Sequence, residues 1–254
     1  MLNLVSDNNI KIYGYQSDGK VPSEVLSLLN QNTVSLFHGS RGGIIPPIKP
    51  ISRERCDFGK GFYMGNSEIQ PKGLIAGDQA PYFYSLSLDI KFLRSVNAKI
   101  IYLSGEGWLN TVLSYRDKIP VFSALEHTHD LKRELDDCDL IIGRIADDRM
   151  NTAFRRFENY GLTDIGLKAC LEYVNYGYQF VAKSQLACDC IDIVSERELP
   201  DDEIDFVNDY TVNQRKKSMD IVNEMAIKYQ REGRYLNEII SELKTKPYEG
   251  ISLL

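Results

Sequence analysis

The sequence has few residues of the kinds that build metal centres and disulfide frameworks. Its 254 residues include three histidines, five cysteines and one tryptophan. Among the cysteines only Cys188 and Cys190 stand close together, and a lone C-x-C is a weak signal for metal or redox chemistry. His127 and His129 lie in EHTHD, which fits a polar loop better than a metal site. We therefore expect no metal, and cysteines that act as small buried side chains in a reducing cytoplasm.

Long apolar runs and the common nucleotide-binding glycine motifs are also missing. No segment is long and apolar enough to span a bilayer, and the first residues do not resemble a signal peptide. There is no G-x-G-x-x-G between a strand and a helix and no G-x-x-x-x-G-K-[ST], which argues against a Rossmann or P-loop site. The net charge of −6 argues against non-specific nucleic-acid binding, although a local basic groove remains open. We expect a cytoplasmic protein with no membrane partner.

What is present is the composition and patterning of a mixed globular fold. Hydrophobic residues make up 43% and charged residues 26% of the chain, which is ordinary for a folded domain. Short alternating or apolar runs predict strands at 33–38, 61–64, 82–88, 98–103, 139–145, 178–182 and 190–194. Amphipathic patterns predict helices at 22–29, 105–115, 150–160, 163–175, 204–230 and 235–243, and Asn66 or Ser67 could cap another short one. The order of these elements predicts an α+β fold with a mixed sheet.

Composition divides the chain into three parts. Residues 1–32 form an N-terminal segment, loosely packed over residues 1–20 and carrying one short helix. Residues 33–195 hold all the predicted strands and form the main domain. Residues 196–254 form a helical C-terminal extension that could pack on this domain or mediate association. The single tryptophan, Trp108, is expected to be a core side chain.

Two motifs near the first strands have the residue types of a ligand site. His38-Gly39-Ser40 follows a short apolar run, and the stretch 57–63 reads Asp-Phe-Gly-Lys-Gly-Phe-Tyr. Glycines allow backbone to approach a ligand closely, and the arginines between the motifs suit contacts with phosphate or carboxylate. We expect Asp57 to organise the second motif by contacting Arg53 or Arg55. Each residue also has a structural reading: a core histidine after a strand, and an ordinary strand tyrosine.

Two later positions extend the pattern. The predicted strand at 139–145 runs into Ala-Asp-Asp-Arg, so that Asp147 and Asp148 either stand at the rim of a site or cap the helix that follows. Gln179 lies in the predicted strand 178–182. It could also be a surface strand residue, with Gln185 as the functional amide instead.

In this order the four motifs resemble the ADP-ribosyltransferase superfamily over residues 34–195. The resemblance is to the branch with a His–Tyr–acid/amide triad, which includes diphtheria toxin and the poly(ADP-ribose) polymerases, and most closely to an uncharacterised bacterial family within it. It implies a split mixed/antiparallel sheet with flanking helices that binds NAD as a substrate. The implied chemistry breaks the bond between nicotinamide and ribose through a transition state that resembles an oxocarbenium ion.

The resemblance also implies roles for individual residues. Tyr63 would stack on the nicotinamide, and the second motif, including Gly61, would cover that end of NAD. Arg53, or else Arg41, would bind the pyrophosphate. The remaining contacts would be made by His38 to the adenosine-side ribose, by the Gly39 backbone to the carboxamide, by Ser40 to the nicotinamide-side ribose and by Gln179 to the ribose 2′-hydroxyl.

Gln179 stands where well-known members of this branch have a glutamate. An amide can orient a ribose but adds no charge to stabilise the transition state, so we expect Asp147 and Asp148 to supply it. The implied function is mono-ADP-ribosyl transfer from NAD to a macromolecular acceptor, a protein or a nucleic acid, by a bacterial toxin or defence effector that an antitoxin or other protein partner could silence. The alternatives are an NAD glycohydrolase and a nucleotide-binding module without turnover.

Overall fold

The computed structural model describes residues 10–13, 21–78, 81–116, 132–146, 150–173 and 177–245. The chain forms two compact units, which are described separately. Unit 1 comprises Met1–Ile145 with Tyr176–Asn208, and unit 2 comprises Ala146–Asn175 with Asp209–Leu254. This grouping differs from the boundaries predicted at residues 33–195 and 196–254. Residues 146–175 group with the C-terminal helices, and Asp164 of this segment binds Arg234 directly.

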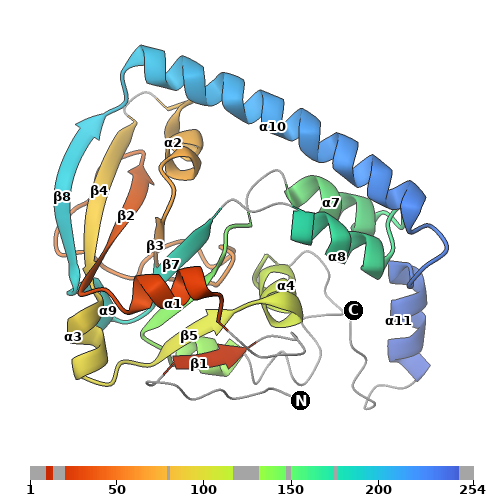
Figure 1. Ribbon diagram of the computed structural model, residues 1–254, viewed down its shortest axis with the longest axis horizontal. Coiled ribbons are helices and arrows are strands. Elements are labelled where there is room, and N and C mark those ends of the chain that lie inside the picture. The colour runs from red at the N-terminus through yellow and green to blue at the C-terminus, as the bar shows by residue number, and fades with distance from the viewer. Residues whose placement is uncertain are drawn as a thin grey trace. The chain divides into compact units, whose positions relative to one another are not determined.

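Unit 1 is built on one mixed β-sheet, so the predicted α+β fold is confirmed. Its eight strands within the described residues have the order β1-β5-β6-β7-β3-β2-β4-β8 (Figure 1). The pairs β1–β5 and β5–β6 are parallel and the remaining pairs are antiparallel. The strands are β1 (Ile10–Tyr13), β2 (Thr33–Ser40), β3 (Phe62–Gly65), β4 (Tyr82–Asp89), β5 (Ile100–Leu103), β6 (Leu140–Arg144), β7 (Tyr178–Ala182) and β8 (Ile191–Glu198).

The sheet differs from the sequence prediction at both edges. β1 lies in a segment that was predicted to be loosely packed. The strand was missed because its four residues are too few for a clear alternation to stand out. It pairs outside β5, so β5 is an internal strand. β8 continues to Glu198, past the predicted strand end at residue 194 and into the first residues of the predicted C-terminal extension. Asn66 does not cap a helix: its side-chain oxygen accepts from the Tyr178 backbone N–H at 2.7 Å.

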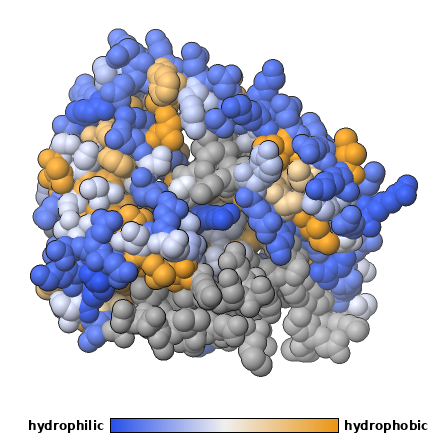
Figure 2. All heavy atoms as spheres, viewed as in Figure 1, coloured by the Kyte–Doolittle hydropathy of each residue, from blue (hydrophilic) through white to orange (hydrophobic). Residues whose placement is uncertain are grey.

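The β8 edge carries features that discourage association with other strands. Seven of its eight residues are exposed, and most of the residues in its second half are charged. Its register against β4 shifts between Ser85 and Leu86. Charged side chains and bulges of this kind protect an open strand edge from pairing with another chain. On the face shown in Figure 2, apolar side chains lie in small groups among hydrophilic ones.

The ladder of the sheet is nearly interrupted between β2 and β3. β2 pairs with β4 through eight residue pairs and β3 with β7 through four, but β2 and β3 share the single pair Phe37–Gly65. Beyond this pair the two strands part (Figure 1). Because backbone groups at such a gap lack strand partners, side chains or ligands can bind there.

Helices and core side chains cover both faces of the sheet. Alternate residues of β2 point to opposite faces: Leu36 belongs to the core cluster that includes Val25 of α1, whereas Phe37 packs against the cluster that includes Ile75 of α2. Trp108 is buried, as predicted, and its indole N–H donates to the Arg144 carbonyl at 2.9 Å. The helices labelled in unit 1 are α1 (Ser23–Leu29), α2 (Ile69–Ile75), α3 (Ile90–Ser95), α4 (Gly105–Tyr115) and α9 (Gln185–Cys188).

Unit 2 is helical in its described residues. It contains α7 (Met150–Glu158), α8 (Asp164–Tyr173) and α11 (Leu236–Thr245), together with the part of α10 (Asp201–Lys228) that follows Asn208. The buried Asp164 carboxylate accepts hydrogen bonds from the Arg234 backbone and guanidinium. In the part of the chain that the structure describes, no helix is both long and apolar enough to cross a membrane.

Candidate functional site

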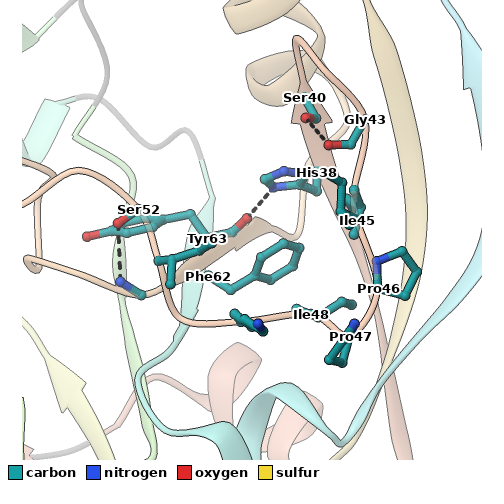
Figure 3. Close-up of a pocket in the computed structure, with 14 residues that line it drawn as sticks. His38, Ser40, Gly43, Ile45, Pro46, Pro47, Ile48, Ser52, Phe62 and Tyr63 are labelled. Carbon is teal, nitrogen blue, oxygen red and sulfur yellow. Dashed lines mark hydrogen bonds between the residues drawn. The ribbon is translucent and has the colours of Figure 1, made fainter.

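A cavity of about 490 Å³ opens where β2 and β3 part (Figure 3). This volume is typical of small-molecule sites. Residues of both sequence motifs line it, because β2 supplies His38 and Ser40 and the second motif supplies Gly61, Phe62 and Tyr63. The connection between the two strands lines the rest, through Gly43, Ile44, Ile45, Pro46, Pro47, Ile48, Lys49, Ile51 and Ser52.

His38 bridges the gap between the two strands. Its Nδ1 lies 2.7 Å from the Tyr63 carbonyl oxygen, and because a carbonyl can only accept, Nδ1 carries the proton. Burial lowers the pKa of His38, which favours the neutral ring. In that tautomer Nε2 is a hydrogen-bond acceptor. The ring also stacks on Phe62 at a centroid distance of 4.6 Å, so that it is fixed by two contacts.

We expect the stability of the protein to depend on pH through His38. Because burial lowers its pKa below the ordinary value of 6.5, the unfolded chain binds a proton where the folded chain does not. The stabilising contribution is therefore complete above about pH 6.5 and is lost as the pH falls below it. Urea midpoints at about pH 7.5 and about pH 5.5 should differ more for the wild type than for His38→Gln, which cannot titrate there. Equal pH dependence of the two proteins would contradict this assignment.

The connection after β2 is anchored to the body of unit 1 at several points. Ser40 Oγ donates to the Gly43 carbonyl at 2.9 Å. The Ile44 backbone N–H donates to the Tyr84 hydroxyl, also at 2.9 Å. Further along, Gln185 Nε2 donates to the Ile48 carbonyl at 2.9 Å. Gln185, the alternative to Gln179 as the functional amide, thus supports the backbone of the cavity wall and is not among the residues that line the cavity.

Tyr63, predicted to stack on a ligand ring, and its neighbour Phe62 have different surroundings in the structure. Phe62 lies beside His38, whereas the Tyr63 side chain points the other way (Figure 3). The Tyr63 hydroxyl donates to the Gly59 carbonyl at 2.7 Å and accepts from the Phe58 N–H at 2.9 Å. Burial, and then the Asp57 charge, raise the pKa of Tyr63, so it keeps its proton. Phe62 was missed by sequence reasoning, although alternation along β3 places it on the same face as His38.

Gln179 is buried and is not among the residues that line the cavity. Its Nε2 donates to Asp57 Oδ2 at 3.0 Å and to the Arg144 carbonyl at 3.1 Å. Asp57 Oδ1 in turn pairs with Arg116, at 2.7 Å to Nε and 2.6 Å to Nη2. Asp57 therefore organises the second motif, as expected, but through Arg116 at the end of α4, which no pattern in the sequence indicated.

Gly39 has a structural reason to be glycine that does not involve a ligand. A Cβ at this position would lie 2.4 Å from the Pro71 carbonyl oxygen of α2. Gly39→Ala is therefore expected to lower the free energy of unfolding by about 1–3 kcal/mol in the absence of any ligand. Gly42→Ala is the matched control, because a Cβ added at Gly42 would meet nothing within 4 Å. Equal urea midpoints for the two variants would show that α2 does not pack this closely.

Three cationic residues belong to the cavity lining or adjoin it in sequence. Lys49 lines the cavity and is exposed, and it was not singled out from the sequence. Arg53 is exposed and directly follows Ser52 of the lining. Arg41 is also exposed and pairs with Asp78 at 3.0 Å. Asp147 and Asp148 lie outside the described residues.

The two motifs and most of the sheet that carries them fall within a single matched region. Residues 34–193, more than half of the chain, match the family described as "Protein of unknown function (DUF3990)". The chain belongs to this DUF3990 family. Comparisons with curated proteins and with solved structures found no match. The DUF3990 region begins in β2 and ends in β8, so it includes every residue of the cavity lining.

Proposed function

We propose that the cavity binds NAD and that the protein transfers its ADP-ribose to a macromolecular acceptor, a protein or a nucleic acid. One observation carries the proposal. Two motifs that resemble those of ADP-ribosyltransferases contribute to a single cavity, at the point where the sheet separates. A split sheet with NAD bound at its opening is what the resemblance implies. A toxin or defence role, silenced by a protein partner, is a further part of this proposal and rests on the resemblance alone.

The lining offers suitable contacts for the parts of a dinucleotide. The neutral His38 presents Nε2 as an acceptor for a ribose hydroxyl. Ser40 adds a hydroxyl, and the apolar wall from Ile44 to Ile48 provides a surface for a planar ring. Lys49 of the lining, and Arg53, which follows Ser52 of the lining in sequence, are cations suited to binding a pyrophosphate. These contacts would stabilise bound NAD whether or not the protein then cleaves it.

A nucleotide-binding module without turnover is a second candidate, and one observation favours it. None of the described residues that line the cavity is an aspartate or glutamate. The transition state for loss of nicotinamide carries positive charge on the ribose, and a nearby carboxylate is the usual source of stabilisation. Gln179 supplies an amide and uses its N–H groups on protein acceptors. Binding and turnover must therefore be measured separately.

The deciding experiment follows NAD labelled on its adenylate part. The protein is incubated with labelled NAD and a cell extract, and protein, nucleic acid and small molecules are separated. Label on a macromolecule supports the transferase, free ADP-ribose alone supports the glycohydrolase, and saturable binding without nicotinamide release supports the binding module. Absence of binding would overturn all three.

The cavity is tested by a matched pair of variants. His38→Ala is expected to weaken NAD binding about tenfold or more, because it removes both the acceptor and the stacking partner of Phe62. Leu26→Ala is the control, because Leu26 is a partly exposed side chain of α1 outside the lining. Isothermal titration calorimetry measures both. Equal affinities would place the NAD site elsewhere.

A further inference from the structure

We infer that Gln179, Asp57 and Arg116 form a latch that holds the second motif in place as one wall of the cavity. Gln179 and Asp57 are thus positioning residues, and neither touches the substrate directly. The loop that they hold is residues 57–61, which runs directly into the lining residues Gly61, Phe62 and Tyr63. The effect on NAD rests on the proposed function, whereas the effect on the loop does not.

The latch joins three elements that are distant in sequence. Arg116 directly follows α4, Gln179 lies in β7 and Asp57 lies in the loop itself. The Asp57 carboxylate receives a different partner on each oxygen: Arg116 on Oδ1 and Gln179 on Oδ2. Its side chain is only 12% exposed, and that of Arg116 is 15% exposed. A shielded, charge-assisted arrangement of this kind fixes geometry more strongly than an exposed pair.

Other contacts hold the same loop. Lys183 Nζ donates to the Phe58 carbonyl at 2.8 Å. The Phe58 side chain is fully buried, and a Cβ at Gly143 would lie 2.7 Å from its ring. Gly59 has a positive φ of 73°, and a Cβ there would lie 2.5 Å from the Tyr115 ring. None of these side chains lines the described cavity, so they act on it through the position of the loop.

The two bonds of Gln179 explain why an amide is needed here. Nε2 donates both of its hydrogens, one to the Asp57 carboxylate and one to the Arg144 carbonyl. An ionised glutamate has no hydrogen to donate. Gln179→Glu would lose both bonds and set two carboxylates about 3 Å apart, which is repulsive in a buried site. Gln179→Glu introduces the residue that well-known transferases have at this position. In this protein we expect it to loosen the 57–61 loop and to lower the NAD affinity.

The test measures the loop and the ligand site independently in the full chain. Hydrogen exchange of the peptide that covers residues 57–61 is compared in wild type, Gln179→Glu and the double variant Asp57→Asn/Gln179→Glu. In the double variant the amide introduced at position 57 can donate to the carboxylate introduced at position 179, which restores one bond with reversed polarity. Gln31→Glu supplies the same chemical change at an exposed turn as a control.

We expect exchange in this peptide to rise about tenfold in Gln179→Glu and to return part of the way in the double variant. NAD affinity, by calorimetry, should fall and recover in the same order, with no change in Gln31→Glu. Wild-type exchange in Gln179→Glu, or higher nicotinamide release from it, would overturn the latch. If the wild type binds no NAD, the proposed function fails, while the exchange data still decide the latch.

Discussion

Asp164→Ala is expected to lower the free energy of unfolding by about 3–5 kcal/mol, the largest effect of any single change considered. Asp164 has a side chain only 4% exposed. Its Oδ1 accepts from the Ile165 and Arg234 backbone N–H groups, each at 2.8 Å, and Oδ2 accepts from the Arg234 guanidinium at 3.1 Å. Alanine would remove the common acceptor of these hydrogen bonds, which links the Arg234 backbone and guanidinium to the start of α8. It would also release the turn before α11 from the start of α8.

The chain contains a matched control for this change. Arg234 makes a second ion pair with Glu242, at 2.8 Å, and Glu242 is exposed. Glu242→Ala is expected to cost no more than about 1 kcal/mol, because exposed pairs contribute little. Urea unfolding followed by circular dichroism at 222 nm, which reports the helices, measures both variants. A similar shift for the two would mean that burial of Asp164 does not determine its contribution.

Asp57→Ala is expected to lower the free energy of unfolding by about 3 kcal/mol and to abolish NAD binding within the accessible range. The change removes the carboxylate that pairs with Arg116 and one acceptor of Gln179. Without the contacts of Asp57 to Arg116 and Gln179, the 57–61 loop would no longer keep Gly61 and Tyr63 in place in the cavity lining. Stability and affinity should therefore fall together, as seen by urea unfolding and calorimetry.

Glu54→Ala is the control for this second change, three residues earlier in the same connection. Glu54 pairs with Lys60 at 2.9 Å, but both side chains are exposed. Its removal is expected to leave the urea midpoint and the NAD affinity at the wild-type values. If Asp57→Ala and Glu54→Ala had the same free energy of unfolding, the Asp57–Arg116 pair would not stabilise the protein. That result would contradict the latch inferred for Gln179, Asp57 and Arg116.

Much of the sheet could be predicted because its strands are short apolar or alternating runs. The residues of β2, β4 and β7 follow this pattern closely, and their predicted and observed limits nearly coincide. The two motifs were assigned to one site through the resemblance to a known superfamily, and the structure places His38 of the first beside Phe62 of the second. The short helices α3 and α9 were not predicted, because four to six residues contain too little periodicity.

The contacts that hold the second motif could not be predicted, because their partners are far away along the chain. Asp57 meets Arg116 across 59 positions and Phe58 meets Lys183 across 125. An arginine after a helix and a lysine after a strand resemble ordinary surface residues in sequence. Similarly, the glycine at position 39 was read as an approach for a ligand, whereas the structure shows the Pro71 carbonyl beside it. Local sequence patterns therefore predict helices and strands, whereas contacts between residues distant in sequence are seen only in the folded structure.

The division into two units has a practical consequence for dissecting the protein. The chain passes between the units three times, at residues 145–146, 175–176 and 208–209. Neither unit is therefore one continuous stretch that a protease or a stop codon could separate from the other. A fragment that ends at residue 195 would keep α7 and α8 but lose Arg234, and the Asp164 carboxylate would lose its counter-ion. Deletion mapping would then report misfolding as loss of function, so the roles of the two units are better separated by point substitutions.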